Sequence, residues 1–400
     1  MKNKKLFWLY LLSASIYATQ GLESLPGLAM FAFLKEKLGL TPDKIMFLSS
    51  IIALPWLIKP IFGFVIDNYL SKKSWLLWSL IGSILVSFYF GLSPYLTIPI
   101  IIGMSILGNL STAWRDISND GLACVEGKEN DCCAIFQNVQ WTAITLSGIV
   151  TGLAGGFIAD HFSYKFAYLC LIPIYLIILG IVSKYREINP LKELKQQYNN
   201  SVCYNKNSFW ETLISYKELF TNKPFLLGCL FIFLFNFSPS IGTPLKYIER
   251  DNFHWSWTFL GILDALFLGV SLIGSFLYWK FGKRFNLKKI FYWAVFISAS
   301  TTLCYLHFTK ISAIVYGILF SIVAMFIFLT VMTFMAESTI KGKESTSFAL
   351  LCSVNNLAAT LSLAVGGWLF PIVGLKWLII LSAGTSFLCL PLIKKLKIGE

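Results

Sequence analysis

Charged side chains lie close together in the segment WRDISND, residues 114–120, directly after the apolar run IPIIIGMSILGNL at 98–110. Asp116 and Asp120 are four residues apart, so on a helix their carboxylates share one face. Two like charges in this position repel each other, which predicts that one of the two carboxyls binds a proton. Arg115 points about 100° away and is expected to address a different neighbour. The pattern predicts a proton site, and the alternative is that Asp120 only holds loops near the end of a span.

A second acid stands in an interrupted segment, QGLESLPG at 20–27. Glu23 is flanked by Gly21, Pro26 and Gly27; proline removes a backbone donor and glycine weakens a helix, so this helix is expected to bend or open. An acid at membrane depth beside a broken helix is typical of a substrate or ion site. The alternative is a packing kink in which Glu23 pairs with Lys59.

A lysine lies in the proline-interrupted segment LPWLIKPIFG at 54–63. Lys59 is too far from either end of its apolar run for its ammonium group to reach water easily. Binding of an anionic substrate and a structural pair with an acid are both open for this residue. Trp56 lies three residues earlier on the same helical face and is able to stack on a planar ligand, although a lone Trp also serves simple packing.

A small residue and an acid precede a basic loop a little further along the chain. Gly63 and Asp67 are followed by Lys72 and Lys73. Glycine permits close approach of two helices, and an aspartate accepts hydrogen bonds from a neighbouring helix N-terminus or an arginine. The motif predicts a gate rather than a binding site.

These charges are unusual because the chain of 400 residues is 56% hydrophobic and only 13% charged, with a mean hydropathy of +0.69. A soluble domain carries about 25% charged residues. The composition therefore indicates an all-α integral membrane protein, in contact with lipid. In such a protein the net charge of +13 reflects cytoplasmic loops rich in Lys and Arg rather than nucleic-acid binding. The apolar N-terminal segment is expected to stay as a first span.

The apolar stretches predict twelve transmembrane helices, since about 20 apolar residues cross a bilayer. The predicted spans are 6–34, 43–68, 74–92, 97–124, 132–160, 163–183, 223–248, 257–279, 287–306, 311–338, 346–370 and 375–393. The longest polar stretch, 184–222, divides them six and six. We therefore expect an N-terminal bundle (1–183), a cytoplasmic linker (184–222) and a C-terminal bundle (223–400).

The distribution of basic residues predicts the orientation. Lys and Arg are concentrated in the loops on the side of the two termini, which places both termini in the cytoplasm. The two halves also resemble each other: VEGKE at 125–129 and IKGKE at 340–344 each precede a span with paired amides. Two parallel six-span halves indicate a major facilitator fold. Short loops favour a bacterial inner membrane.

Motifs for other chemistry are not found in the sequence. The three histidines, His161, His254 and His307, have no metal-binding spacing, and there is no P-loop, GxSxG or HExxH motif. We expect neither metal nor cofactor, and an enzyme is the least favoured class.

Several segments together resemble the folate–biopterin transporter family, a branch of the major facilitator superfamily. They are LPWLIKPIFGFVID (54–67), DISNDGLACVEG (116–127), QNVQW (137–141), the stretch 259–293 and FMAESTIKGKESTSFALLCSVNNL (334–357). The resemblance implies that Lys59, Asp116, Asp120, Gln137 and Trp141 matter for transport. Arg115 is not explained by the resemblance.

The resemblance and the chemistry together predict a proton-coupled transporter of folate or a pterin that works by alternating access. A carboxylate such as Asp116 or Glu23 suits the amino-pyrimidinone edge of a pterin, and Lys59 or Arg115 suits the anionic glutamate tail. Trp56 or Trp141 is able to stack on the ring. The alternatives are a transporter of another planar or anionic metabolite or drug, and a sensor or scaffold that moves no solute.

Overall fold

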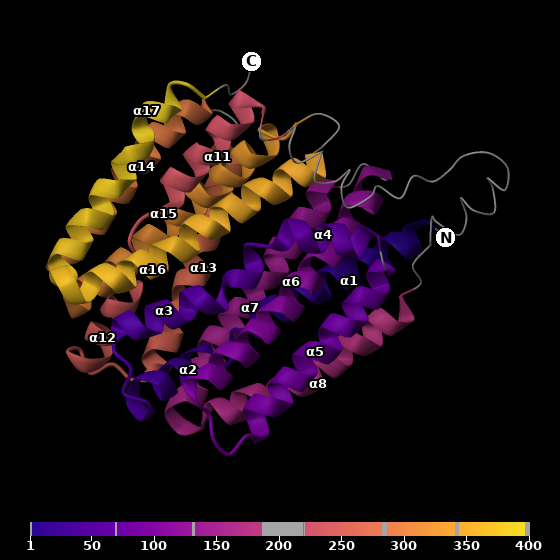
Figure 1. Cartoon of the computed structure of the whole chain (residues 1–400), viewed down its shortest axis with the longest axis horizontal. Coiled ribbons are helices and arrows are strands. Elements are labelled where there is room, and N and C mark those ends of the chain that lie inside the picture. Colours follow the sequence, from indigo (N-terminus) through magenta and orange to yellow (C-terminus); the bar gives the residue numbers. More distant parts are fainter. Residues whose placement is uncertain are drawn as a thin grey trace.

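A computed structural model describes residues 2–68, 70–129, 133–185, 219, 221–281, 286–340 and 344–396. This part of the chain is helical and contains no strand. Most of the predicted linker, 184–222, lies outside the described residues. Figure 1 shows two helical bundles side by side, one formed by the first half of the chain and one by the second.

The first bundle contains α1 (Lys2–Leu22), α2 (Gly27–Ala32), a π-helical turn (Phe33–Lys37), α3 (Pro42–Ile52), a 3-10 turn (Leu54–Trp56), α4 (Lys59–Asn68), α5 (Lys72–Leu92), α6 (Ile98–Glu129), α7 (Cys133–His161) and α8 (Tyr164–Lys184). The second contains α11 (Lys223–Asn236), α12 (Gly242–Asp251), α13 (Trp257–Phe281), α14 (Leu287–Cys304), a 3-10 turn (Tyr305–His307), α15 (Lys310–Glu337), α16 (Glu344–Thr385), a 3-10 turn (Ser386–Cys389) and α17 (Leu390–Ile393). Each predicted span coincides with one or more of these elements.

Seven helical stretches in the described chain are long and apolar enough to cross a membrane. The last of them, 347–393, covers two predicted spans, because Gly374 has a φ of 72° and interrupts α16. The remaining four predicted spans either contain a break, as between α1 and α2, or carry several charges, as α6 does. The number twelve therefore stays a prediction, while the all-helical membrane architecture is confirmed.

Proline and glycine explain the breaks that shape the first bundle. The break between α1 and α2 occurs at the sequence ESLPG, where a glutamate precedes Pro26 and Gly27, as predicted. Pro55 and Pro60 likewise separate α3, a 3-10 turn and α4. The break between α11 and α12 follows Asn236, in the sequence NFSPSIG, and was not predicted. Each break removes backbone hydrogen bonds and lets side chains from one span face a new direction.

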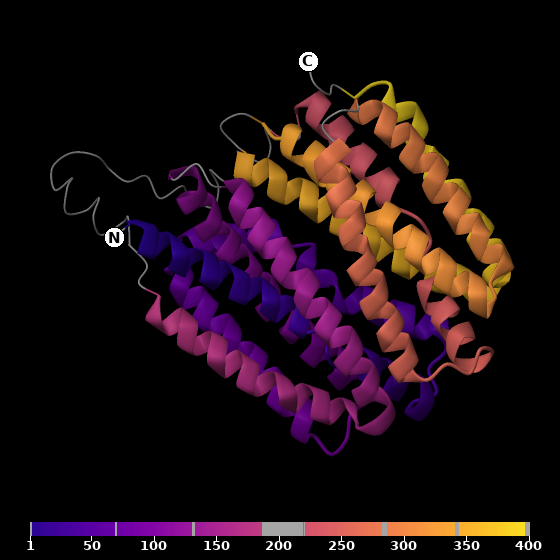
Figure 2. The ribbon, with the colours of Figure 1, turned by 180° about the vertical axis from the view of Figure 1, so that it is seen from behind.

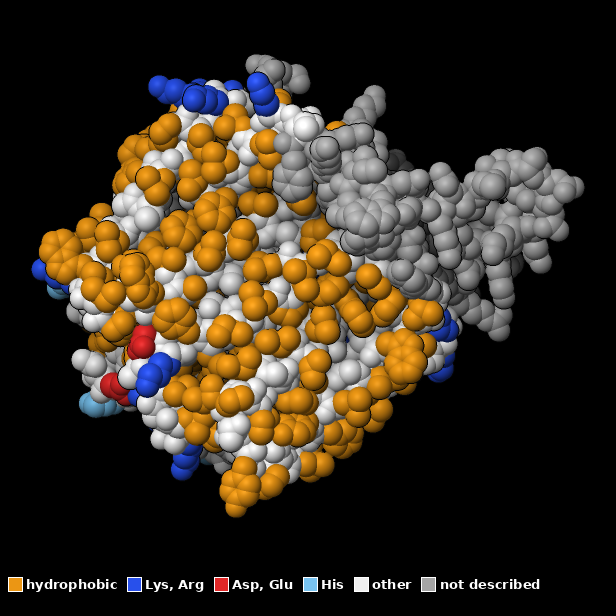
Figure 3. Space-filling model, viewed as in Figure 1, with side chains coloured by type: hydrophobic (Ala, Val, Ile, Leu, Met, Phe, Trp, Pro, Cys, Tyr) orange, Lys and Arg blue, Asp and Glu red, His pale blue; other side chains and the backbone are white. Residues whose placement is uncertain are grey.

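The surface is what a lipid environment requires. Figure 3 shows hydrophobic side chains across the broad side of the molecule and Lys and Arg at its edges. Trp78, Leu85, Trp293 and Trp377 are each at least 60% exposed. Large apolar side chains in this number are unfavourable in water and favourable against lipid tails. The protein is therefore a multi-pass integral membrane protein.

The two bundles touch through closely packed helix pairs. Along the boundary visible in Figure 2, α7 of the first bundle packs against α13, and α3 packs against α16. Gly152, Gly156 and Gly261 stand where α7 and α13 cross, and a Cβ on Gly261 would lie 2.2 Å from the carbonyl oxygen of Gly152. Asp160 at the end of α7 accepts hydrogen bonds from the first backbone N–H groups of α13, including that of Trp257 at 3.0 Å. Small residues thus allow the bundles to approach closely.

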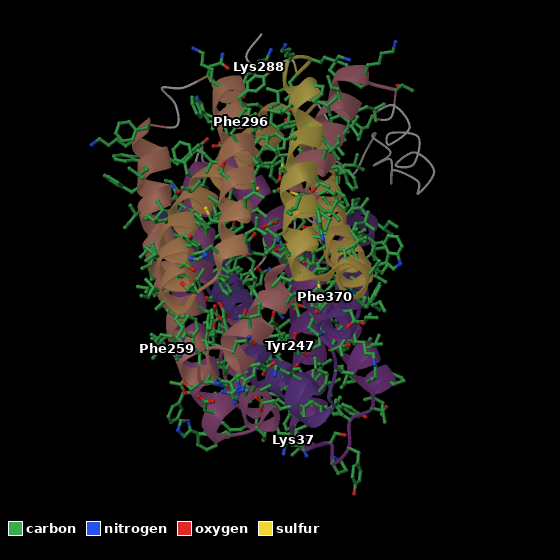
Figure 4. The ribbon with its side chains drawn as sticks, turned by 90° about the vertical axis from the view of Figure 1, so that its left-hand side faces the viewer. Lys37, Tyr247, Phe259, Lys288, Phe296 and Phe370 are labelled. Carbon is green, nitrogen blue, oxygen red and sulfur yellow. The ribbon has the colours of Figure 1, made fainter. Side chains whose placement is uncertain are left out.

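The bundles are also joined at the end of the molecule opposite the two chain termini. Lys35 forms an ion pair with Asp251 at 2.5 Å, and Glu36 forms one with Arg250 at 3.0 Å. Figure 4 shows Lys37 at this end, Tyr247 nearby and Lys288 at the far end. These two are the ion pairs that cross between the bundles in the described part of the chain, and we call them the inter-bundle seal. These pairs therefore link the two bundles on this side.

Candidate functional site

The buried lysine predicted from the sequence forms an ion pair inside the first bundle. Lys59 is the first residue of α4, and the break before it directs its side chain toward α6. Its ammonium nitrogen lies 2.5 Å from Oδ2 of Asp116 and 4.3 Å from the centre of the Trp56 ring. Gln20 of α1 donates a hydrogen bond of 2.7 Å to the other oxygen, Oδ1. The pair therefore joins α1, α4 and α6, and the Asp116 side chain is only 7% exposed.

The second aspartate of α6 binds neutral partners. One helical turn beyond Asp116, Oδ1 of Asp120 accepts a hydrogen bond of 2.9 Å from the Tyr17 hydroxyl and one of 3.4 Å from Gln140 Nε2. Gln140 also donates to Ser13 at 2.9 Å. Asp120 thus connects α1, α6 and α7, and among the described residues it forms no salt bridge. As predicted, the two aspartates project from the same side of α6.

The arginine that the family resemblance left unexplained pairs with Glu23. The Arg115 guanidinium is fully buried and forms a salt bridge with Oε1 of Glu23. It also donates to Ser83 at 3.0 Å, while Glu23 accepts further hydrogen bonds of 2.9 Å from Thr112 and Tyr175. This group joins α1, α5, α6 and α8.

The alternative in which Glu23 pairs with Lys59 is therefore wrong. Arg115 and Asp116 are adjacent on α6, so their side chains leave the helix about 100° apart. Glu23 lies on the side of α6 that Arg115 faces, whereas Lys59 lies on the side that Asp116 faces. The rotation of α6 decides which acid meets which base, and the spacing within one helix does not reveal it.

A polar cavity lies beside these ion pairs, within the first bundle. It has a volume of about 450 Å³, and polar side chains from α1, α5, α6 and α8 line it. The polar residues that line it are Gln20, Glu23, Ser24, Trp56, Ser83, Ser87, Ser105, Asn109, Thr112, Tyr168 and Tyr175. Gln20 and Glu23 connect the cavity directly to the two ion pairs. A volume of several hundred Å³ with few charged groups is suited to a small solute.

The two predicted stacking residues lie in different surroundings. Trp56 lines the polar cavity, and its indole N–H donates to Asn109 at 2.7 Å. Its backbone carbonyl accepts a hydrogen bond of 3.2 Å from Asn356, which belongs to α16 of the second bundle. Trp141 of α7 lies outside the polar cavity and faces Phe328 of α15 with 5.0 Å between ring centres. Trp56 and Trp141 therefore do not form one stacking platform.

The predicted gating residues Gly63 and Asp67 both belong to α4, and Gly63 faces α6. A Cβ on Gly63 would be 3.9 Å from Ile117, which is an ordinary contact, so this glycine is not required for close approach there. The side chains of Asp67 and Gln137 lie outside the described ones. The gating role of Gly63 and Asp67 remains a prediction.

Sequence reasoning missed the neutral partners of the buried charges. Ser13, Tyr17 and Gln20 recur on α1 at spacings of three or four residues, so they form a polar stripe along an otherwise apolar helix, and Ser24 continues this spacing in the break that follows. Such a stripe in a membrane span indicates a face that meets polar groups of neighbouring helices. This signal was present in the sequence and would have predicted which face of α1 contacts α6.

Comparison with solved structures identifies the fold. A nucleoside transporter, NupG, superposes with a TM-score of 0.74 at 15% identity, covering 98% of each chain. A D-xylose-proton symporter superposes with a TM-score of 0.75 at 11% identity, also covering 98% of each chain. At these identities the likeness concerns the fold, which is that of the major facilitator transporters.

Comparison with known sequences identifies the family. The "Folate-biopterin transporter" of Synechocystis sp. (strain ATCC 27184 / PCC 6803 / Kazusa) is 27% identical, over 98% of this chain and 82% of that protein. "Folate transporter 1" of Plasmodium falciparum (isolate 3D7) is 23% identical, over 88% of this chain and 70% of that protein. The model of the BT1 family matches residues 20–397, so the chain belongs to the BT1 family.

Proposed function

We propose that this protein is a secondary transporter that moves folate or pterin-type solutes across a membrane by alternating access, coupled to protons. Relatives in the family carry the names of folate and biopterin transporters. The observation that carries the proposal is the Lys59–Asp116 ion pair at membrane depth. Its partners Trp56 and Gln20 line a polar cavity, so substrate in that cavity is within reach of the pair.

Lys59 is the cation for the anionic part of the substrate. Its side chain is 17% exposed and its ammonium group lies over the Trp56 ring, so the cation is held in place beside Asp116. A folate carboxylate that binds Lys59 competes with Asp116 for the same ammonium group. Substrate binding and the charge of Asp116 are therefore linked, because one cation cannot fully compensate two anions in a low-dielectric site.

Asp120 is the residue that holds the coupling proton. Asp116 and Asp120 carry two negative charges, and Lys59 is the one cation that binds either of them in the described part of the chain. The partners of Asp120 are the neutral groups of Tyr17 and Gln140, so a proton there removes an uncompensated buried charge. The Asp120 carboxyl also interacts electrostatically with Lys59, Asp116 and the thiol of Cys352, which lies on α16 of the second bundle.

The alternation is a rocking of the first bundle against the second. The α7–α13 and α3–α16 contacts serve as the pivots, and the inter-bundle seal closes one end. We place the termini, and hence the unsealed end, in the cytoplasm of a bacterial inner membrane, with 184–222 as the cytoplasmic linker. This orientation follows from the excess of Lys and Arg in the loops on that side. Reporter fusions at residue 400 and in the loop near residue 95 test the orientation.

The proposal is tested by uptake of labelled folic acid into liposomes that contain the purified protein. We expect uptake to rise when the side of substrate entry is made acidic, and to fall when a protonophore removes the gradient. Asp120→Asn should abolish this dependence on the pH gradient while exchange of labelled for unlabelled substrate continues. Glu337→Gln, an equally conservative change at the exposed last residue of α15 and outside the polar cavity, serves as the control.

Two results would contradict the proposal. If the wild-type protein transports a nucleoside or a drug from a competitor panel but neither folic acid nor a pterin, the substrate class is wrong. If Asp120→Asn and Asp116→Asn both retain uptake that follows the pH gradient, these aspartates do not carry the coupling proton.

A further inference from the structure

A second cavity, of about 640 Å³, lies between the two bundles and is not explained by the buried ion pairs. Its walls come from α2, α7, α13 and α15 and from the break after α1. The residues that line it are Ser24, Leu28, Trp141, Gly148, Thr151, Gly152, Asp264, Phe267, Leu268, Ser271, Ser321, Ala324, Met325 and Phe328. On α7, α13 and α15 these residues recur at helical spacing, so one face of each helix is turned toward the cavity.

The cavity is mainly aromatic and apolar, with one charged residue among those described that line it. The rings of Trp141 from the first bundle and Phe328 from the second pack edge-to-face with 5.0 Å between their centres. Phe267 also lines the cavity. The hydroxyls of Thr151 and Ser321 donate to backbone carbonyls of their own helices. An apolar cavity with a few directed polar groups is the usual form of a site for a flat ligand.

Asp264 is the directed polar group. Its side chain is 43% exposed, and its Oδ2 lies 3.4 Å from the ammonium nitrogen of Lys246 on α12. This is a long contact, and no other hydrogen bond to the carboxylate occurs within the described residues. An exposed carboxylate in an aromatic cavity is suited to accept two parallel N–H groups from the edge of a planar heterocycle.

We infer that this inter-bundle cavity binds the pterin ring of the substrate, with Asp264 accepting from its amino-pyrimidinone edge and the contacting pair Trp141 and Phe328 forming an aromatic wall against it. This inference rests on the proposed function and assigns the ring to a place distinct from the site of the anionic tail. Ser24 lines both cavities, so a ligand is able to extend from one into the other past the break after α1. Because Trp141 and Phe328 belong to different bundles, a ring that packs against both contacts both moving parts.

The inference is tested by equilibrium binding of labelled folic acid to purified protein, with two competitors. One competitor is biopterin, which has the ring without the glutamate tail, and the other is 4-aminobenzoyl-glutamate, which has the tail without the ring. Asp264→Asn places an amide N–H₂ group opposite the N–H donors of the ring, so competition by biopterin should weaken roughly tenfold or more. Competition by 4-aminobenzoyl-glutamate should stay unchanged, which also shows that the variant is folded.

A second variant and two controls complete the design. Phe328→Leu removes an aromatic wall and should weaken competition by biopterin about threefold to tenfold. Phe276→Leu, on the exposed outer face of α13, and Glu337→Gln, at the exposed end of α15, should leave both competitors unchanged. If wild-type protein binds folic acid but biopterin competes equally well with wild type, Asp264→Asn and Phe328→Leu, the ring lies elsewhere and the inference is wrong. If wild-type protein binds neither folic acid nor biopterin, the proposed function itself fails.

Discussion

Removing Glu23 should destabilise the first bundle strongly, because its partner Arg115 cannot reach water. The Arg115 side chain is 0% exposed, and Glu23 is the acid that binds it among the described residues. Breaking a buried ion pair on one side leaves an uncompensated charge, which costs about 3–5 kcal/mol. For a bundle of this size, roughly 2–4 °C of melting temperature correspond to each kcal/mol. We therefore expect Glu23→Gln to lower the apparent Tm by roughly 6–20 °C.

The measurement is thermal unfolding of purified protein in one detergent, followed by intrinsic fluorescence at a fixed heating rate because such unfolding is often irreversible. A double-mutant cycle separates the ion pair from other effects. Arg115→Met alone should also destabilise, since Glu23 then keeps a buried charge with only the hydroxyls of Thr112 and Tyr175 as donors. The double variant Glu23→Gln/Arg115→Met should lie closer to wild type than either single variant.

A matched control shows that the effect belongs to the buried pair. Glu36→Gln breaks an ion pair whose acid is 40% exposed, so solvent screens the remaining charge and the loss should be at most about 1 kcal/mol. The reasoning fails if Glu23→Gln shifts the Tm no more than Glu36→Gln does. It also fails if the double variant is destabilised by the sum of the two single effects, because the residues would then act independently.

Three further predictions follow from the same contacts. Lys35→Asp should weaken the inter-bundle seal, so a cysteine introduced in the inter-bundle cavity should be labelled faster by a bulky thiol reagent. The double variant Lys35→Asp/Asp251→Lys should restore the low labelling rate, and equal labelling of both variants would exclude a role for this pair. Gly261→Ile should reduce transport and stability together, because even a Cβ there would overlap the carbonyl oxygen of Gly152 on α7. Gly269→Ile is the control, since a Cβ at Gly269 meets no atom within 4 Å. Equal activity of both variants would contradict a close crossing of α7 and α13. Lys59→Ala should weaken competition by 4-aminobenzoyl-glutamate roughly tenfold or more while biopterin competes as before, and weakening of both competitors would argue against a tail-specific role.

The helices were predictable because their signals are local. A run of about 20 apolar residues marks a span whatever the rest of the chain does, so the predicted spans coincide with observed helices. The breaks beside Glu23 and Lys59 were predictable for the same reason, since proline and glycine act on their own turn. The break after Asn236 was missed because its only proline is surrounded by small polar residues that also occur inside continuous spans.

The pairing of charges was not predictable, because it depends on helix rotation. Asp116 and Asp120 were correctly placed on one side of α6, since that follows from spacing within one helix. Which acid binds Arg115 depends on how α1, α4 and α8 pack around α6, and one sequence carries no direct information about this. Asp264 was not among the predicted site residues for a related reason, since it is the only acid of its predicted span and the residues that line the cavity with it belong to other helices.

The distribution of charge suggests that the two bundles have different roles, with the buried charges in the first bundle and the aromatic walls mainly in the second. The first bundle contains both ion pairs that are buried at membrane depth and the acidic pair of α6, whereas the second contributes aromatic walls and Asp264 to the inter-bundle cavity. A proton that binds the first bundle changes its internal charge balance, but it moves the second bundle only through something that touches both. A ligand that packs against both Trp141 and Phe328 provides such a contact, and the Asn356 hydrogen bond to the Trp56 carbonyl joins the bundles near Lys59. We therefore propose that substrate in the inter-bundle cavity adds to these direct contacts and helps to convert a charge change in one bundle into movement of the other.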